Sequence, residues 1–207
     1  MHGTAQPPLT AGHVIHWARW YDLLGRIPFL RAIREKLVEL AAPAPGERVL
    51  DVGCGTGTLA IALKSRVGAG EVSGIDASPE MIEVARGKAA RAGAEVAFQV
   101  SPIEALPFPD ASFDLVTSSL MLHHLPDDLK RRGLEQVRRV LRPGGRLMAV
   151  DFAAHSHSPL GHLLALFGHA HGESTVATLT PLLTETGFGE VQAIPTRHTS
   201  FAFIRAR

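Results

Sequence analysis

The chain has 207 residues, which suits one domain with a full hydrophobic core. With 21 basic and 20 acidic side chains its formal charge is +1, and this balance disfavours the broad cationic face by which proteins bind duplex nucleic acid. A single cysteine rules out an internal disulfide and no apolar stretch reaches 18 residues, so we expect a soluble, cytoplasmic protein without a leader or a membrane span.

The first elements along the chain are expected to be helical. Apolar side chains recur every three or four residues from Val14 to Leu40, which is the helical period. Pro28 falls inside this pattern and is expected to divide it into two helices, and two further prolines at 43 and 45 end it. Residues 1–45 are therefore predicted to form an N-terminal helical cap.

The core, residues 46–207, alternates short apolar runs with helical patterns. Alternation of this kind predicts a parallel sheet with right-handed crossovers. A polar stretch separates the last two runs, which favours an antiparallel hairpin at the sheet edge. In order, the expected elements are strand 48–52, helix 58–67, strand 72–76, helix 79–92 capped by Ser78, strand 95–100, strand 113–118, helix 128–141, a turn at 143–145, strand 146–152, and strands 188–194 and 200–205.

The most informative segment is residues 49–57, where a strand ends in Asp51 and runs into three alternating glycines. This order is typical of a loop that approaches a cofactor beyond the carboxyl end of a strand. Two classes of cofactor fit such a loop. A dinucleotide loop has the same glycine pattern with a later acidic residue for the ribose, and its ligand carries a pyrophosphate; S-adenosylmethionine carries no phosphate. A carboxylate on the lip of the loop repels a pyrophosphate and attracts an ammonium or sulfonium, so Asp51 favours the methyl donor. A tight turn without a ligand is the structural alternative.

Four further blocks follow this loop in a fixed order. The five are Asp51-Val-Gly53-Cys54-Gly55-Thr-Gly57, Gly74-Ile-Asp76-Ala77-Ser78-Pro-Glu-Met81, Glu104-Ala-Leu-Pro-Phe-Pro-Asp-Ala-Ser-Phe113-Asp114, His123-His124-Leu125 and Leu141-Arg-Pro143-Gly144-Gly145. In these blocks the chain resembles the class I S-adenosylmethionine-dependent methyltransferases, most closely the small-molecule group that includes ubiquinone and menaquinone biosynthesis enzymes. The resemblance implies one methyltransferase domain over residues 1–207, with a lid insertion at about 153–175.

The same resemblance implies an α/β, Rossmann-like fold. Its seven-stranded, mostly parallel sheet would have the order 3-2-1-4-5-7-6, with the last strand antiparallel and helices on both faces. It also implies that S-adenosylmethionine is the cofactor and that a small organic molecule accepts the methyl group on oxygen, nitrogen or carbon.

The resemblance assigns Asp76 to the ribose hydroxyls, with Ala77 and Met81 beside the adenine. For Met81, ordinary core filling is an equal alternative. Tyr21 would belong to a segment that closes over the cofactor, where an aromatic face near a sulfonium is favourable, although it could instead bury a helix face. The other expected cofactor contacts are Asp51, Gly53, Cys54, Gly55, Gly57, Ser101, Pro102, Ile103 and Ser118.

Pro102 departs from the family's pattern. Relatives usually carry an aspartate at this position, which binds the adenine amino group. Proline offers no side-chain acceptor, so the amino group would need a backbone carbonyl, Ser101 or water. This substitution, with the lack of an obvious catalytic pair, leaves open a cofactor-binding module without turnover, and a nicotinamide oxidoreductase is the third alternative.

Methyl transfer needs mainly alignment of the acceptor and exclusion of water. Where the acceptor is a hydroxyl, a base helps, and His124 is the first candidate with His123 second. Orientation of their loop by hydrogen bonds is the equal alternative.

Five histidines lie between His155 and His171, in the expected lid. We favour a polar lid there over a metal site, because no aspartate or cysteine partner is close by. The basic residues from Lys130 to Arg142 interleave with apolar ones at helical spacing, which predicts the solvated face of an amphipathic helix.

Overall fold

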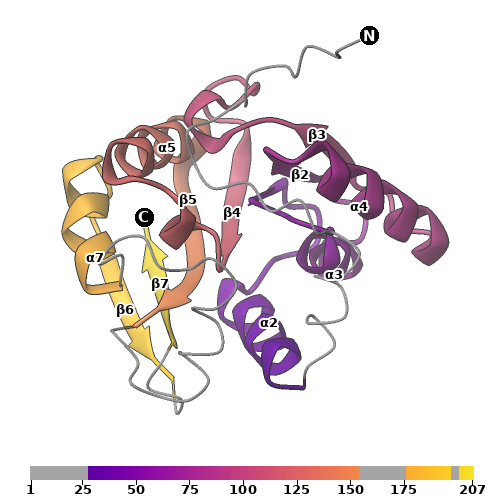
Figure 1. The fold of residues 1–207 in the computed structure, drawn as a ribbon, viewed down its shortest axis with the longest axis horizontal. Coiled ribbons are helices and arrows are strands. Elements are labelled where there is room, and N and C mark those ends of the chain that lie inside the picture. The colour runs from indigo at the N-terminus through magenta and orange to yellow at the C-terminus, as the bar shows by residue number, and fades with distance from the viewer. Residues whose placement is uncertain (1–27, 154–175, 197–200) are drawn as a thin grey trace, which may run out of the picture.

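The computed structural model describes residues 28–153, 176–196 and 201–207. Its seven strands form one sheet in the order β3-β2-β1-β4-β5-β7-β6 (Figure 1), which confirms the predicted order. β7 runs antiparallel to both of its neighbours, as expected for the last strand, and the pairs from β3 to β5 are parallel. The elements are α2 (Pro28–Ala41), β1 (Val49–Val52), α3 (Thr58–Val67), β2 (Val72–Asp76), α4 (Pro79–Ala92), β3 (Ala97–Val100), η1 (Ile103–Ala105), β4 (Phe113–Ser119), η2 (Leu122–His124), α5 (Asp127–Val140), β5 (Leu141–Phe152), α7 (Val176–Glu185), β6 (Val191–Pro195) and β7 (Phe201–Ala206).

Helices cover both faces of the sheet, as predicted. Side chains alternate along a strand, so Leu50 of β1 joins a buried cluster with α5 and α7, while Val49 joins a second cluster with α2, α3 and α4. Both residues are fully buried. No helix among the described residues is long and apolar enough to cross a membrane.

Local capping residues set several helix ends at the positions that the sequence predicts. The hydroxyl of Ser78 accepts a hydrogen bond from the backbone N–H of Met81 at 3.2 Å, and Pro79 occupies the first turn of α4. Gly93 ends α4 in the left-handed region, at φ 62°. Pro28 begins α2, as the predicted break requires; the helix expected before it lies outside the described residues.

Strand β5 begins earlier than predicted. Leu141 already pairs with Phe113, yet the next pair joins Leu115 to Arg146. The intervening Pro143, Gly144 and Gly145 therefore stand outside the regular ladder, with Gly144 at φ 78°. The predicted turn is real, but it interrupts the strand as an irregularity and does not precede it.

Helix α7 is not predicted by the apolar periodicity. Pro181 lies within it, and proline normally argues against a helix interior because it lacks an N–H. Two threonines bond back to the preceding turn: Thr180 Oγ1 donates to the carbonyl of Val176 at 3.0 Å and Thr184 Oγ1 to that of Thr180 at 3.3 Å. Leu179 and Leu183 nevertheless bury one side of the helix in the core, so packing outweighs weak local propensity.

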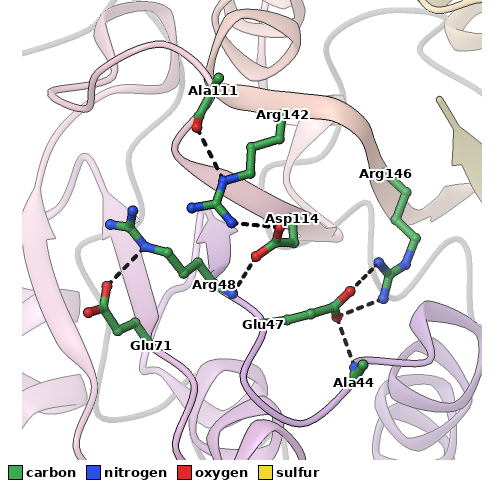
Figure 2. A network of polar contacts seen from close by, with 8 residues as sticks. All are labelled: Ala44, Glu47, Arg48, Glu71, Ala111, Asp114, Arg142 and Arg146. Carbon is green, nitrogen blue, oxygen red and sulfur yellow. Dashed lines mark hydrogen bonds and ion pairs between the residues drawn. The ribbon is translucent and has the colours of Figure 1, made fainter.

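At the amino edge of the parallel strands, charged side chains form a paired network (Figure 2). The guanidinium of Arg146 donates to both carboxylate oxygens of Glu47, at 2.8 and 2.9 Å, and also to the carbonyls of Ala41 and Ala42 at the end of α2. Burial alone would raise the pKa of Glu47, but these donors and the N–H of Ala44 hold that pKa below its usual value. These charged contacts at the amino edge of the sheet therefore stabilise the fold.

Arginines of the basic run also stabilise the fold. α5 is amphipathic, as predicted, but Arg139 does not simply extend into solvent. Its guanidinium donates to the carbonyls of Leu106 and Phe108 and to the carboxylate of Asp110. The Leu-Pro-Phe-Pro-Asp block is thus fastened to α5.

Candidate functional site

The glycine turn after β1 is shaped by three left-handed residues. Gly53, Gly55 and Gly57 have φ angles of 67°, 51° and 76°, which side chains rarely adopt. The backbone N–H of Gly55 donates to the Asp76 carboxylate at 2.8 Å, and that of Cys54 donates to the carbonyl of Ile75 at 2.9 Å. The turn is therefore fixed to the end of β2, and the first two predicted blocks meet.

Close packing also requires two of these glycines. A Cβ at Gly53 would lie 2.2 Å from Cγ of Met121, and one at Gly57 would lie 2.7 Å from the ring of Phe98. Met121 follows β4, so its side chain lies over the start of the turn. It was not predicted as a site residue, although its place two residues before the histidine pair is the signal that could have indicated it.

Asp51 lies beneath the turn and not on its lip. Its side chain is 1% exposed, and Oδ1 accepts a hydrogen bond from the hydroxyl of Thr117 on β4 at 2.8 Å. Oδ2 accepts no side-chain hydrogen bond among the described residues, although the backbone N–H of Ala60 in α3 stabilises the carboxylate. Burial is the main reason why the pKa of Asp51 rises to about 7, and the nearby Asp76 carboxylate adds to it.

The predicted ribose residue, Asp76, ends β2. Its Oδ2 accepts from Gly55 and its Oδ1 accepts from the N–H of Ser78 at 2.9 Å, so it also orders the start of α4. Burial raises its pKa, and those two N–H groups oppose the rise. A carboxylate has about four acceptor positions, which leaves room for ribose hydroxyls. Ala77 is half-buried and Met81 is buried.

Cys54 has no reactive environment. Its thiol is buried between the two carboxylates, and burial followed by the charges of Asp51 and Asp76 raises its pKa well above the usual value. It packs in the second core cluster, so its contact with a cofactor would be through the backbone of the turn.

The segment after β3 carries Ser101, Pro102 and Ile103. The Ser101 hydroxyl donates within its own turn, to the carbonyls of Pro102 and Ala105 at 3.2 and 3.1 Å. Ile103 is buried against Gly133 of α5, where an added Cβ would lie 2.9 Å from Cγ2 of Ile103. The Ser101 hydroxyl thus donates within its own turn, and Pro102 and Ile103 have no polar side-chain atom to offer.

The end of β4 leads into the histidine pair. Ser118 is buried with no hydrogen-bond partner for its hydroxyl among the described residues. Leu120 has φ 53°, a left-handed conformation that is strained for leucine and is common at functional sites. This bend directs the chain from β4 into η2.

Asp151, at the end of β5, holds His123. Its Oδ1 lies 2.7 Å from Nδ1 of His123, and its Oδ2 accepts from the backbone N–H of His123 at 3.2 Å. Because the carboxylate accepts, Nδ1 carries the hydrogen of this contact. His123 is buried whereas His124 is half-buried, and their ring centroids lie 4.0 Å apart.

Aromatic rings continue from this pair across three elements. His123 meets Phe152 at 4.7 Å between centroids, Phe152 meets Phe201 at 5.0 Å, and Phe201 meets Phe29 at 5.4 Å. Phe29 and Phe152 are only partly buried. This series, which we term the ring path, borders the carboxyl ends of β4 and β5.

Some predictions lie outside the described residues. They are Tyr21, nearly all of the lid at 153–175, and the five histidines from 155 to 171. The residues that are described contain no cluster of three potential metal ligands. A groove of about 330 Å³ lies between α5 and α7, but it is lined by none of the predicted site residues.

Comparison with known proteins identifies the kind of domain. A family model described as methyltransferase domain matches residues 49–145. The demethylmenaquinone methyltransferase of Thermus thermophilus is 42% identical over 135 residues, which are 64% of this chain and 60% of that protein. The chain carries a class I S-adenosylmethionine-dependent methyltransferase domain. S-adenosylmethionine is accordingly the cofactor of the domain.

Other similar proteins include an enzyme named for O-methylation and a solved methyltransferase structure. An O-methyltransferase of Aspergillus sclerotiorum is 38% identical over 164 residues, which cover 76% of this chain and 60% of that protein. The crystal structure of a methyltransferase from Aquifex aeolicus has a TM-score of 0.74 at 22% identity, covering 91% of this chain and 97% of the other, and so shows the same fold. The chain spans 60% of the length of both curated relatives.

The residues present fit this cofactor. The left-handed turn allows close backbone approach, and Asp76 has acceptor capacity left for a ribose. Asp51 lies beneath the turn, so its carboxylate does not form the negatively charged lip that was expected to select a cation.

Proposed function

We propose that this protein transfers the methyl group of S-adenosylmethionine to a small organic acceptor and releases S-adenosylhomocysteine. The observation that carries the proposal is the tie between Gly55 and Asp76, which joins the glycine turn to the ribose-type carboxylate at the edge of a methyltransferase sheet. The bound cofactor would supply an activated methyl on its sulfonium. The residues of the chain would bind and orient the cofactor and exclude water from around its methyl group.

The acceptor would lie against the ring path and Met121. The partly buried rings of Phe29 and Phe152 offer apolar faces at the carboxyl edge of the sheet, next to the half-buried His124. A flat, apolar acceptor with one polar substituent suits these surroundings. The relatives named for demethylmenaquinone and for O-methylation fit such an acceptor.

His124 would accept a proton from an acceptor hydroxyl, and His123 would hold it in place. His124 is the more exposed ring, whereas His123 is buried and held at two points by Asp151. Asp151 is thus a positioning residue that acts through His123. A base of this kind contributes typically about 10² to 10⁴ in rate.

A transfer assay tests the proposal. The purified protein is incubated with S-adenosylmethionine and a panel of phenols, quinols and amines, and S-adenosylhomocysteine is measured. We expect S-adenosylhomocysteine to form with at least one planar acceptor. For His124→Gln we expect kcat to fall at least about 100-fold while the cofactor Kd is unchanged. Tight cofactor binding with no product across the panel would contradict the proposal.

Asp151→Asn distinguishes positioning from simple structural support. If Asp151 acts through the histidine pair, this variant should shift the pH profile of kcat as well as lower its maximum, because an amide no longer selects the tautomer of His123. A lower melting temperature with an unaltered pH profile would make its role structural only.

A further inference from the structure

A lysine of the neighbouring helix α4 is hydrogen-bonded to the glycine turn. Nζ of Lys88 donates to the hydroxyl oxygens of Thr56, within the turn, and of Thr58, the first residue of α3, at 2.9 Å each. Helices α3 and α4 lie next to each other (Figure 1) and share the second buried cluster. One ammonium group from α4 therefore joins the turn to the start of the helix that follows it.

The position of Thr56 makes this contact important for the shape of the turn. Gly55 and Gly57, which flank it, have φ angles of 51° and 76°, and a glycine can leave such a conformation at little cost. Thr56 itself is 4% exposed, and its hydroxyl accepts from Lys88. Because this residue cannot turn without breaking the hydrogen bond, the contact restricts the backbone at both glycines.

The charge of Lys88 is unfavourable for the end of α3 that it contacts. The N-terminus of a helix carries a partial positive charge, which repels a cation. Lys64, at the other end of α3, is the opposite case: its Nζ donates to the carbonyls of Gly68 and Gly70, at 3.0 and 2.8 Å, where the dipole favours a cation. Both lysines are half-buried. Lys64 is thus suited to stabilise the helix, whereas Lys88 is suited to fix the geometry of the turn.

We propose that Lys88 is a positioning residue for cofactor binding, which acts through Thr56 and Thr58 by holding the glycine turn in the conformation that admits S-adenosylmethionine. This role rests on the proposed function, because the ligand is the same cofactor. Without the contact, the turn samples other conformations and binding must restore the productive one. The apparent affinity then falls with the fraction of molecules in the productive form, so that a fraction of about one fifth weakens binding about fivefold.

Lys88→Met and Lys64→Met form a matched pair for calorimetric titration with S-adenosylhomocysteine and for thermal unfolding without ligand. Each change removes one ammonium group and two hydrogen bonds from α3 or its turn. For Lys88→Met we expect Kd to rise about 5- to 20-fold and Tm to fall by less than about 3 °C, because loss of a cation from the helix N-terminus offsets part of the lost bonding. For Lys64→Met we expect Tm to fall by at least about 3 °C and Kd to change less than about twofold.

The pair also defines the results that would overturn the inference. A Kd for Lys88→Met within about twofold of the original value would show that the turn does not depend on this lysine. An equal rise of Kd in both variants would show that weakening α3 at either end is sufficient, and the role of Lys88 would then be structural only.

Thr56→Val and Thr56→Ser test the same contact from the turn and decide the question even if Lys88→Met does not fold. Valine keeps the shape and removes the acceptor, so Kd should rise as in Lys88→Met, whereas serine keeps the hydroxyl and should retain a Kd within about twofold of the original. Equal Kd values for these two variants would contradict the inference.

The double variant Lys88→Met with Thr56→Val tests whether the lysine acts through this threonine. Its Kd should lie within about twofold of that of Lys88→Met alone, because both changes remove one contact. Multiplied effects would show that the two residues act separately and would contradict the inference. Failure of the original protein to bind S-adenosylhomocysteine would instead contradict the proposed function.

Discussion

At the scale of single residues, the buried carboxylate of Asp51 has the largest expected effect on behaviour in solution. Its pKa is about 7 in the folded protein against an ordinary value of 3.8. The folded state therefore retains a proton that the unfolded chain has lost between these two values. Stability from this group is fully present below pH 3.8 and is lost as pH rises through about 7.

Asp51→Asn should remove this pH dependence. The amide keeps an oxygen that can accept from Thr117 and carries no charge to desolvate. Without cofactor, we expect the variant to exceed the original protein in unfolding free energy by about 2 kcal/mol at pH 8.5, and by much less at pH 5.5. Urea unfolding at the two pH values measures this. The exposed Glu83→Gln is the control, and identical pH slopes for Asp51→Asn and the original protein would contradict the prediction.

Gly53→Ala should lower the unfolding free energy for two separable reasons. The added Cβ would overlap Met121, and φ 67° is unfavourable for alanine by about 1–2 kcal/mol. We expect a loss of about 2–4 kcal/mol in unfolding free energy and at least tenfold weaker binding of S-adenosylhomocysteine.

The double variant with Met121→Ala isolates the overlap. Because the Met121 side chain is the obstacle, its removal should restore about 1 kcal/mol in the Gly53→Ala background and cost stability in the original one. Additive effects of the two changes would show that the side chains do not interact.

At the scale of elements, α2 depends on a charged clamp. The side chain of Arg146 is 15% exposed and that of Glu47 is 19% exposed. The arginine also binds the carbonyl of Ala41, the last residue of α2, and that of Ala42 after it. Arg146→Ala should lower the unfolding free energy by about 2–4 kcal/mol, because it leaves Glu47 unpaired and the helix end uncapped.

A double-mutant cycle tests this clamp by urea unfolding. Removing Glu47 as well should cost less than the sum of the two single changes, since no lone charge remains. The control is Arg31→Ala, which breaks an exposed pair with Glu35 within α2 and should change stability by less than about 0.5 kcal/mol. A similar loss for both arginines would contradict the assignment.

The elements could be predicted where local chemistry decides them. α3 and β2 have the predicted bounds, and Ser78 with Pro79 fixed the start of α4. α7 could not be predicted, because Pro181 and its threonines oppose a helix locally and only burial of its leucines stabilises it.

The same distinction applies to the site. The sequence indicated the glycine turn, Asp76 and the histidine pair, because they lie in motifs that follow one another in a fixed order along the chain. It placed Asp51 on a lip, whereas pairing of β1 with β4 buries it beside Thr117. Contacts between distant segments, such as Met121 over Gly53, have no local signature.

At the scale of the whole molecule, binding of the cofactor product should raise the melting temperature. A ligand at 100 times its Kd adds about 2.7 kcal/mol to stability, which for this size is roughly 5–10 °C. We expect S-adenosylhomocysteine to produce such a shift in differential scanning fluorimetry and NAD to produce none. A shift with NAD alone would favour an oxidoreductase instead.

The position of β7 has a consequence for how the protein is made. β6 pairs only with β7 in the sheet, and β7 lies between it and β5, with Ile204 and Ala206 fully buried. During synthesis β6 leaves the ribosome before the strand that must hold it. Strands β1 to β5 can assemble early, but residues 191–195 must wait as an unpaired edge. The nascent chain is therefore most vulnerable to chaperone capture or aggregation just before residues 201–206 emerge.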